Sequence, residues 1–190
     1  FCKQIYVFIS LKYLNKYYSQ RAYKEPVIDL KGNQCPELII VIPCYNEPFS
    51  NVKQCIESLI NQEEDPDQTL VLLLINYKSS DSEEIKMASQ SLKNSIDQYV
   101  VKLNQAFMRF HTFLEAFSGK TAGVGKARKI LMDTAFILFY DNAKNGIIVN
   151  LDADTMVHKN YLCKINKFFK THNEIEAASI AFYHPIADRE

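Results

Sequence analysis

The stretch from Gly146 to Asp154 constrains the fold of this chain more than any other feature. An apolar, β-branched run ends there in two carboxylates one residue apart, Asp152 and Asp154. A short apolar run is typical of a strand buried on both faces of a parallel sheet, and ligands of such sheets bind beyond the carboxyl ends of the strands. Carboxylate oxygens suit Mg²⁺ or Mn²⁺, so we predict a metal here that neutralises a diphosphate. The alternative is a plain turn in which one aspartate caps the next helix.

Strand-like and helix-like patterns alternate along the rest of the chain. Short apolar runs predict strands over residues 38–42, 70–75, 110–117, 146–151 and 175–182. Apolar positions at helical spacing predict helices over residues 50–61, 83–105, 126–140 and 158–170. Such alternation builds right-handed βαβ units. The expected fold class is α/β, with a mainly parallel central sheet flanked by helices.

The N-terminal part is expected to stand apart from this sheet. Residues 3–19 carry apolar side chains at helical spacing among lysines, which predicts an amphipathic helix that packs on the domain or contacts a partner. Its apolar positions are Ile5, Phe8, Ile9, Tyr13 and Tyr17. Residues 24–36 contain two prolines and Gly32-Asn33, as a connector does. We therefore divide the chain into residues 1–36, the helix and connector, and residues 37–190, the sheet domain.

Composition excludes several classes of protein. The 22 basic and 22 acidic side chains cancel, which argues against nucleic acid as a partner. Five scattered cysteines without a Cys-x-x-Cys pair argue against a zinc site or a disulfide framework. No run reaches the roughly 18 apolar residues of a membrane-spanning helix. We expect a cytoplasmic protein, with any membrane contact peripheral and at the inner membrane face.

Polar residues also follow two other predicted strands. Pro43, Tyr45 and Glu47 follow strand 38–42, and Asn76 and Asp81 follow strand 70–75. In a ligand site the aromatic ring would offer a platform for a base, and the Glu47 carboxylate would accept a hydrogen bond from a ribose hydroxyl. For residues 43–47 the alternative is a tight turn, since Pro and Asn are turn residues.

Lys120 and Arg128 flank a glycine-containing segment, residues 121–125. A glycine loop that runs into a helix N-terminus presents backbone N–H groups and a positive dipole end to an anion. The alternative is a loop whose cations are solvated. The segment is neither a Walker A loop, which would need glycine at Leu114, nor a dinucleotide fingerprint, which would need glycine at Arg128.

Taken in order, these segments resemble the family 2 glycosyltransferases of the glycosyltransferase A fold. The resemblance covers about residues 38–183 and is carried by residues 43–47, 80–81, 123–128 and 151–154. It implies a Rossmann-like nucleotide-sugar-binding domain of an inverting enzyme of polysaccharide biosynthesis. Such an enzyme transfers a sugar from a nucleotide-diphosphate-sugar donor to a saccharide or lipid-linked acceptor.

The resemblance also implies roles for single residues. Pro43, Tyr45 and Glu47 would line the nucleoside pocket, and Lys120 and Arg128 would lie near the base or diphosphate. Asp154 would bind the divalent metal, Mn²⁺ or Mg²⁺. Asp152 would contact the ribose or the water shell of the metal.

Two departures from the family pattern matter. Asn76 stands where the family usually has the aspartate that binds uracil, which leaves the identity of the base open. The catalytic base of the family lies well downstream of the Asp-x-Asp motif, on the acceptor-binding part. We expect that base beyond residue 190, and assign neither Asp188 nor Glu190 to the role. The chain is thus expected to be a donor-binding fragment that is inactive alone.

Two other functions compete with this one. A haloacid dehalogenase-type phosphatase would use Asp152 as its nucleophile, but that motif needs Thr or Val where Met156 stands. A non-catalytic domain would keep the fold and use the N-terminal helix to bind a partner or a membrane face. The first predicts a phosphoaspartate, and the second predicts no metal-dependent nucleotide binding.

Overall fold

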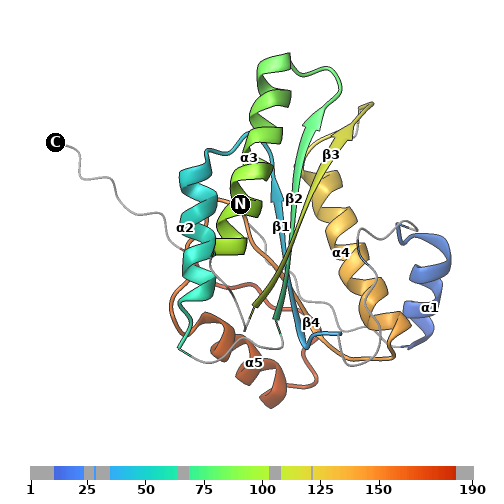
Figure 1. Cartoon of the computed structure of the whole chain (residues 1–190). Helices are drawn as coiled ribbons and strands as arrows, with labels where there is room; N and C mark the ends of the chain where they lie inside the picture. The colour runs from blue at the N-terminus through green and yellow to red at the C-terminus, as the bar shows by residue number, and fades with distance from the viewer. Residues whose placement is uncertain are drawn as a thin grey trace.

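The computed structural model describes residues 11–23, 28, 35–63, 69–102, 108–120 and 122–182, with the backbone alone for residues 11–13. Within these ranges a four-stranded, all-parallel sheet lies between helices, as the α/β fold class predicts (Figure 1). The strands are β1 (Leu38–Cys44), β2 (Thr69–Lys78), β3 (Met108–Phe117) and β4 (Ile147–Asn150). The helices are α1 (Leu11–Gln20), α2 (Phe49–Ile60), α3 (Glu83–Lys102), α4 (Val124–Asp141) and α5 (Tyr161–Thr171).

The strands follow the order β3-β2-β1-β4, so the Asp-x-Asp strand is a neighbour of β1. In the parallel register Cys44 pairs with Ile75, Asn76 with Glu115, and Val41 with Asn150. The carboxyl ends of all four strands therefore lie at one edge of the sheet. The polar turns after β1, β2 and β4 meet at this edge, which is where ligands bind in open α/β sheets.

Each face of the sheet has its own apolar core, because side chains alternate along a strand. One core joins Ile40, Leu73 and Val149 to α2, α3 and α5. The other joins Val41 and Leu74 to α4. Figure 1 shows α2 and α3 on one side of the sheet and α4 on the other, with α1 outside α4. Strands β1 and β2 are buried on both faces, which explains their continuous apolar sequences.

Most predicted elements are confirmed with shifted ends. The predicted strands over residues 38–42, 70–75, 110–117 and 146–151 correspond to β1 to β4, although β1 and β2 continue further into their polar turns. The four predicted helices correspond to α2 to α5. Alternation along the chain thus identified the layers of the fold.

The predicted last strand, residues 175–182, is wrong. This segment has no regular structure and pairs with no described strand. Ile175, Ala178 and Ile180 instead pack against the core that includes α5. These apolar side chains are half-buried by packing against the core, without the backbone hydrogen bonds of a strand. Their spacing along the sequence therefore resembles that of a strand.

The N-terminal helix is confirmed over residues 11–20, and it packs on α4. Ile5, Phe8 and Ile9 lie outside the described residues, as does most of the connector. The Tyr18 ring stacks on Tyr140 at 4.3 Å, and the Tyr17 hydroxyl donates to the buried Asp133 carboxylate at 2.6 Å. Over the described part of the chain, no helix has the length and apolarity needed to cross a membrane.

Candidate functional site

Three positions of the sheet that are not occupied by a large apolar side chain face α4 near the carboxyl ends of the strands. Each of them lies two residues after a side chain that packs against α4, and side chains alternate between the two faces along a strand, so they are on the α4 face as well. These positions are Pro43, Asn76 and Asn150, which follow Val41, Leu74 and Ile148. Asn76 is 0% exposed and Asn150 is 3% exposed. Amide side chains are therefore buried where an apolar strand would ordinarily carry Leu or Val.

These buried amides have unsatisfied polar atoms. Asn76 Nδ2 and Oδ1, together with Asn150 Oδ1, find no hydrogen-bond partner among the described residues, and neither does Arg128 Nε on α4. Most buried polar atoms in native proteins are paired, because an unpaired one costs about 1–3 kcal/mol. Four such atoms on one side of the strand ends indicate that this region is arranged for a polar ligand.

Arg128 lies in the second turn of α4 and reaches the end of β4. Its Nη2 atom is 2.5 Å from Asp152 Oδ1, and the two side chains are 30% and 35% exposed. The helix begins after Gly123, whose φ of 151° is a backbone conformation that side-chain-bearing residues rarely adopt. The glycine thus allows the abrupt entry into α4 that brings Arg128 and the positive helix end to the strand ends.

Tyr45 and Asp81 connect the turns after β1 and β2. The Tyr45 hydroxyl donates to Asp81 Oδ2 at 3.2 Å, and the backbone N–H of Lys78 donates to the same oxygen at 2.7 Å. Burial, and then the nearby Asp81 carboxylate, raise the pKa of the Tyr45 phenol. Asp81 therefore holds the Tyr45 ring in place beside the end of β2.

Glu47 lies two residues before the start of α2. Its Oε2 atom accepts a hydrogen bond from Asn51 Nδ2 at 3.4 Å, and its side chain is half-buried. The preceding Asn46 has a φ of 53°, the left-handed conformation that asparagine tolerates better than most residues. This turn directs the chain away from β1 and leaves Glu47 near the strand end.

The loop after β4 is held by the end of α2. The backbone N–H of Val157 donates to Ser58 Oγ at 3.1 Å, and that of Leu162 donates to Gln62 Oε1 at 3.0 Å. The Asp152 carbonyl accepts from the Thr155 N–H at 3.1 Å, which closes a tight turn around Asp154. Asp154 is exposed at this turn.

The carboxylates of this loop fit a metal that a ligand helps to hold. No group of three or more His, Cys, Asp or Glu side chains able to hold an ion occurs in the described ranges. Mg²⁺ is commonly bound by one or two carboxylates, together with waters and substrate phosphates. The exposed Asp154 suits that arrangement, whereas Asp152 is engaged by Arg128.

Two cysteines beside the loop are poor nucleophiles. Cys44 and Cys55 are buried, and Cys55 Sγ lies 3.8 Å from the Asp152 carbonyl oxygen. Burial, with nearby carboxylates adding to it, raises the pKa of each thiol to about 12. Both thiols stay protonated near neutral pH, which argues against cysteine chemistry here.

The predicted residues are brought together only in part. Asp152 and Arg128 are in contact, as are Tyr45 and Asp81, while Pro43 and Asn76 end neighbouring strands. Lys120 is exposed in the loop after β3, and no described contact joins it to the other residues. Asn150 was missed, although a polar residue inside the apolar run 147–151 was a visible signal.

Solved structures similar to this chain include TarS from S. aureus, at 17% identity and a TM-score of 0.47 over 72% of this chain and 33% of that chain. TarS in complex with UDP-GlcNAc matches at 20% identity and a TM-score of 0.45, over 72% of this chain and 32% of that one. Another is the mannosyltransferase PcManGT from Pyrobaculum calidifontis in complex with GDP-Man and Mn²⁺. It shares 13% identity at a TM-score of 0.45, over 83% of this chain and 38% of that chain.

This chain spans about a third of the length of those structures. No family model and no curated protein matches it. At these identities and TM-scores the similarity decides no functional question, and the function is inferred from the residues of the site.

Proposed function

We propose that this chain is the donor-binding part of a glycosyltransferase that uses a nucleotide-diphosphate sugar. The unsatisfied atoms of Asn76, Asn150 and Arg128 carry this proposal. They combine amide groups, which can read a base or a sugar hydroxyl, with a guanidinium, which suits a phosphate. A ligand that supplied all the missing partners would be polar, partly anionic and of nucleotide size.

Each group has a role in this proposal. Asn76 hydrogen-bonds the base, and the Tyr45 ring, fixed by Asp81, stacks on it. The Nε–H group of Arg128 donates a hydrogen bond to the diphosphate. The Glu47 carboxylate accepts a hydrogen bond from a ribose hydroxyl. Pro43 and Lys120 complete the walls of the site. Asp152 orients Arg128 in the free protein and contacts the ribose or the metal's water shell once the donor binds.

A divalent cation would be held by Asp154, with Asp152 beside it, and by the donor's own diphosphate. Bound there, the cation supplies Lewis-acid stabilisation of the leaving diphosphate. The chain's own residues bind and orient the donor, and Arg128 adds positive charge where the departing phosphate gains negative charge. The acceptor in this proposal is a saccharide or a lipid-linked molecule. Its hydroxyl group attacks the anomeric carbon of the donor sugar with inversion, and the bond from that carbon to the nucleotide diphosphate breaks.

Calorimetric titration with UDP, GDP and their sugars, with and without Mn²⁺, tests the proposal. We expect metal-dependent binding of a nucleotide diphosphate. Arg128→Gln should weaken it about 10- to 100-fold, because hydrogen bonds to charged groups contribute about 1.5–3 kcal/mol. Arg21→Gln makes the same chemical change at an exposed residue away from the strand ends and should leave the affinity unaltered.

The competing functions give different results in the same experiments. A phosphatase would form a phosphoaspartate at Asp152 and hydrolyse phosphate esters, and Asp152→Asn would abolish both. A binding module would give no heat with any nucleotide, with or without metal. Either result contradicts the donor-binding proposal.

A further inference from the structure

Strand β3 is the terminal strand of the described sheet and has one free edge. It pairs with β2 over its full length, Met108–Phe117, and no described segment pairs with its other side. A free edge exposes backbone N–H and C=O groups, and proteins usually blunt it with charged side chains, especially lysine, with proline, or by keeping the strand short. The ten residues of β3 contain neither proline nor lysine, and their two charged residues, Arg109 and Glu115, have opposite signs. This edge is therefore suited to pair with another strand.

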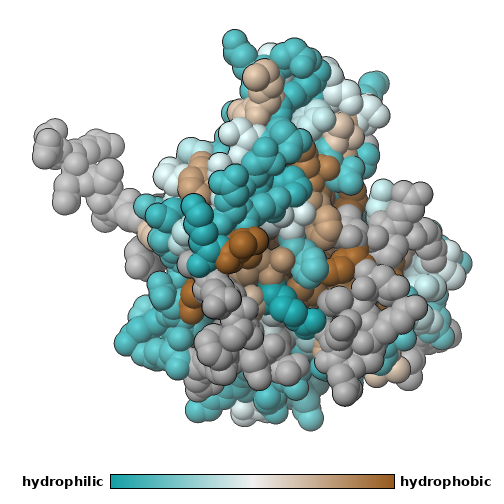
Figure 2. Space-filling model, in the orientation of Figure 1, coloured by the Kyte–Doolittle hydropathy of each residue, from teal (hydrophilic) through white to brown (hydrophobic). Residues whose placement is uncertain are grey.

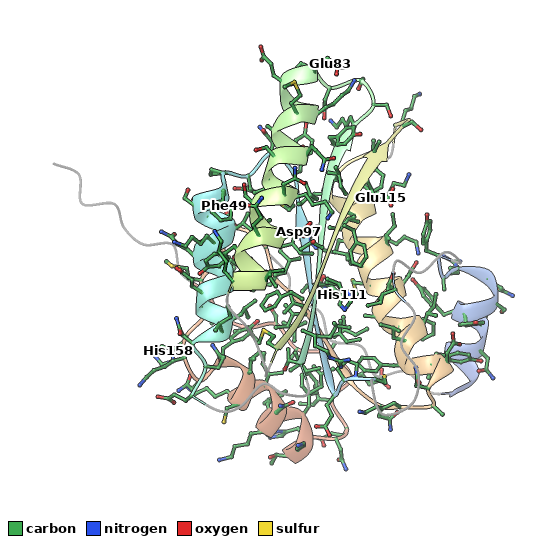
Figure 3. All side chains as sticks on the ribbon, in the orientation of Figure 1. Phe49, Glu83, Asp97, His111, Glu115 and His158 are labelled. Atoms are coloured by element: carbon green, nitrogen blue, oxygen red, sulfur yellow. The ribbon has the colours of Figure 1, made fainter. Side chains whose placement is uncertain are left out.

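The side chains of β3 are half-buried on both faces of the sheet. Phe110 and Leu114 pack toward the α3 face, and Phe113 packs toward the α4 face. Figure 3 shows His111 and Glu115 along β3, with Asp97 of α3 beside the strand. In Figure 2 the same view shows hydrophobic surface near the middle of this face, bordered by hydrophilic atoms. The strand thus carries half-buried apolar side chains together with the charged Arg109 and Glu115.

Two copies of β3 paired antiparallel would place complementary side chains opposite each other. Residues directly opposite in an antiparallel pair share a face of the sheet, so a symmetric pair must be centred on a residue. Centring on Thr112 places Arg109 opposite Glu115. The other pairs are Phe110 with Leu114, His111 with Phe113, and Thr112 with itself. The Thr112 hydroxyl donates to Asp97 Oδ1 within each chain, so the Thr112 pair contributes contact between side chains and no hydrogen bond across the axis.

The neighbouring register fits less well. Centring on Phe113 also uses most of the strand and places His111 opposite Glu115, but it places Arg109 opposite Phe117, without an acidic partner. Because the pKa of His111 is lowered, its ring is a weaker partner for Glu115 than the permanently charged Arg109. Opposite charges, aromatic pairs and Thr–Thr pairs stabilise antiparallel strands, whereas like charges destabilise them. The Thr112 register makes the ion pair twice, because the two-fold axis repeats every contact.

We propose that two copies of this chain associate through β3, paired antiparallel about a two-fold axis at Thr112. The two four-stranded sheets become one continuous sheet of eight strands, a number that open sheets reach. On each face of this sheet, a helix of one copy then lies across the two-fold axis from the same helix of the other copy. Strand β4 lies at the opposite edge of each sheet, so both Asp-x-Asp loops stay accessible.

Sedimentation velocity on charge-reversed variants tests this interface. The unaltered chain should show a concentration-dependent dimer. Arg109→Glu and Glu115→Arg should each weaken self-association at least about tenfold, because each places like charges opposite each other twice. An equimolar mixture of the two variants should dimerise again, since the mixed pair restores opposite charges at both sites. The double variant Arg109→Glu/Glu115→Arg should also dimerise.

A cysteine at the axis provides an independent check. Thr112→Cys should form an intermolecular disulfide under mild oxidation by oxidised glutathione, in which the two thiols lose their protons and electrons to glutathione. A monomeric unaltered chain at every concentration, or a mixture of charge variants that stays monomeric, would overturn the proposal. So would a dimer indifferent to both charge reversals, because its interface would then lie elsewhere or use another register. Circular dichroism of each variant establishes that it is folded.

Discussion

Asn76 shows how one side chain at a strand end can favour binding at the expense of stability. Its amide is fully buried on β2, and neither of its polar atoms has a partner among the described residues. Because desolvation is not compensated, the amide destabilises the free protein. A ligand that pairs with it recovers that energy on binding.

We expect Asn76→Leu to stabilise the free protein and to weaken nucleotide binding. Leucine has the same number of side-chain heavy atoms, branched at the same carbon, and removes two unsatisfied polar atoms, so the free energy of unfolding should rise by about 1–2 kcal/mol. Urea unfolding and calorimetry measure the two effects. If the variant is instead less stable than the unaltered chain, the amide has a structural role and does not serve as a binding group.

The pairing of Arg128 with Asp152 could not be predicted from single residues. The sequence marked each as a site residue, but 24 positions separate them, and only the packing of α4 on the sheet brings them to 2.5 Å. Asn150 was overlooked because its neighbours 147–149 and 151 dominate the apolar pattern. Tertiary contact, and not residue type, distinguishes these residues from ordinary turn or strand residues.

At the scale of elements, α1 is attached to α4 by polar as well as aromatic contacts. Asp133 is 2% exposed and accepts hydrogen bonds from the Tyr17 hydroxyl at 2.6 Å and from the Tyr23 N–H at 2.8 Å. Lys129 forms an ion pair with the same carboxylate. Burial, and then Asp133, raise the pKa of the Tyr17 phenol. One buried carboxylate thus organises this junction.

Asp133→Asn should loosen α1 without unfolding the sheet. The neutral amide loses the charge-assisted bonds, so we expect a loss of about 2 kcal/mol in stability and faster proteolysis within residues 11–23. Limited proteolysis followed by mass spectrometry locates the cuts. Cleavage spread evenly over the sheet would show that the carboxylate supports the whole fold rather than this helix.

Strand β3 should give the protein a pH-dependent stability near neutrality. Burial lowers the pKa of His111 below its ordinary value, and nearby Arg109 lowers it further. In the window between the folded pKa and about 6.5, the unfolded chain binds more protons, so stability rises with pH. This stability is present above the unfolded pKa and is lost as pH falls through the folded pKa.

Urea unfolding at pH 7.5 and pH 5.5 measures this dependence. We expect His111→Gln to reduce the difference in unfolding free energy between the two pH values, because the variant lacks the titrating ring. An unchanged difference would assign the pH dependence to other groups.

At the scale of elements, some strands could be predicted from the sequence and one predicted strand was wrong. Strands β1 and β2 were identified because burial on both faces leaves continuous apolar runs, which few other structures require. Residues 175–182 show a similar local pattern but lack a neighbouring strand among the described residues. Strand formation depends on a hydrogen-bonding partner as much as on apolar spacing, and a local pattern contains no information about the partner.

At the scale of the whole molecule, donor binding should stabilise the fold. A ligand that binds only the folded state adds about 2.7 kcal/mol at one hundred times its Kd. Thermal unfolding with a nucleotide-diphosphate sugar and Mn²⁺ should therefore show a higher Tm than the free protein. Adding EDTA should remove most of the increase, and Asp154→Asn should behave as the unaltered chain does with EDTA. An increase that persists in EDTA would contradict a metal-assisted site.

Helix α4 touches both ends of the Asp-x-Asp strand. Near its C-terminus, the Phe139 ring leaves no space at Gly146, where an added Cβ would lie 2.2 Å from the ring. In its second turn, Arg128 holds Asp152. From Gly146 to Asp152 an extended strand spans about 20 Å. An alanine at Gly146 would therefore have to displace the Phe139 ring. If α4 shifts to make that space, Arg128 on the same helix moves with it, although Gly146 is remote from Asp152.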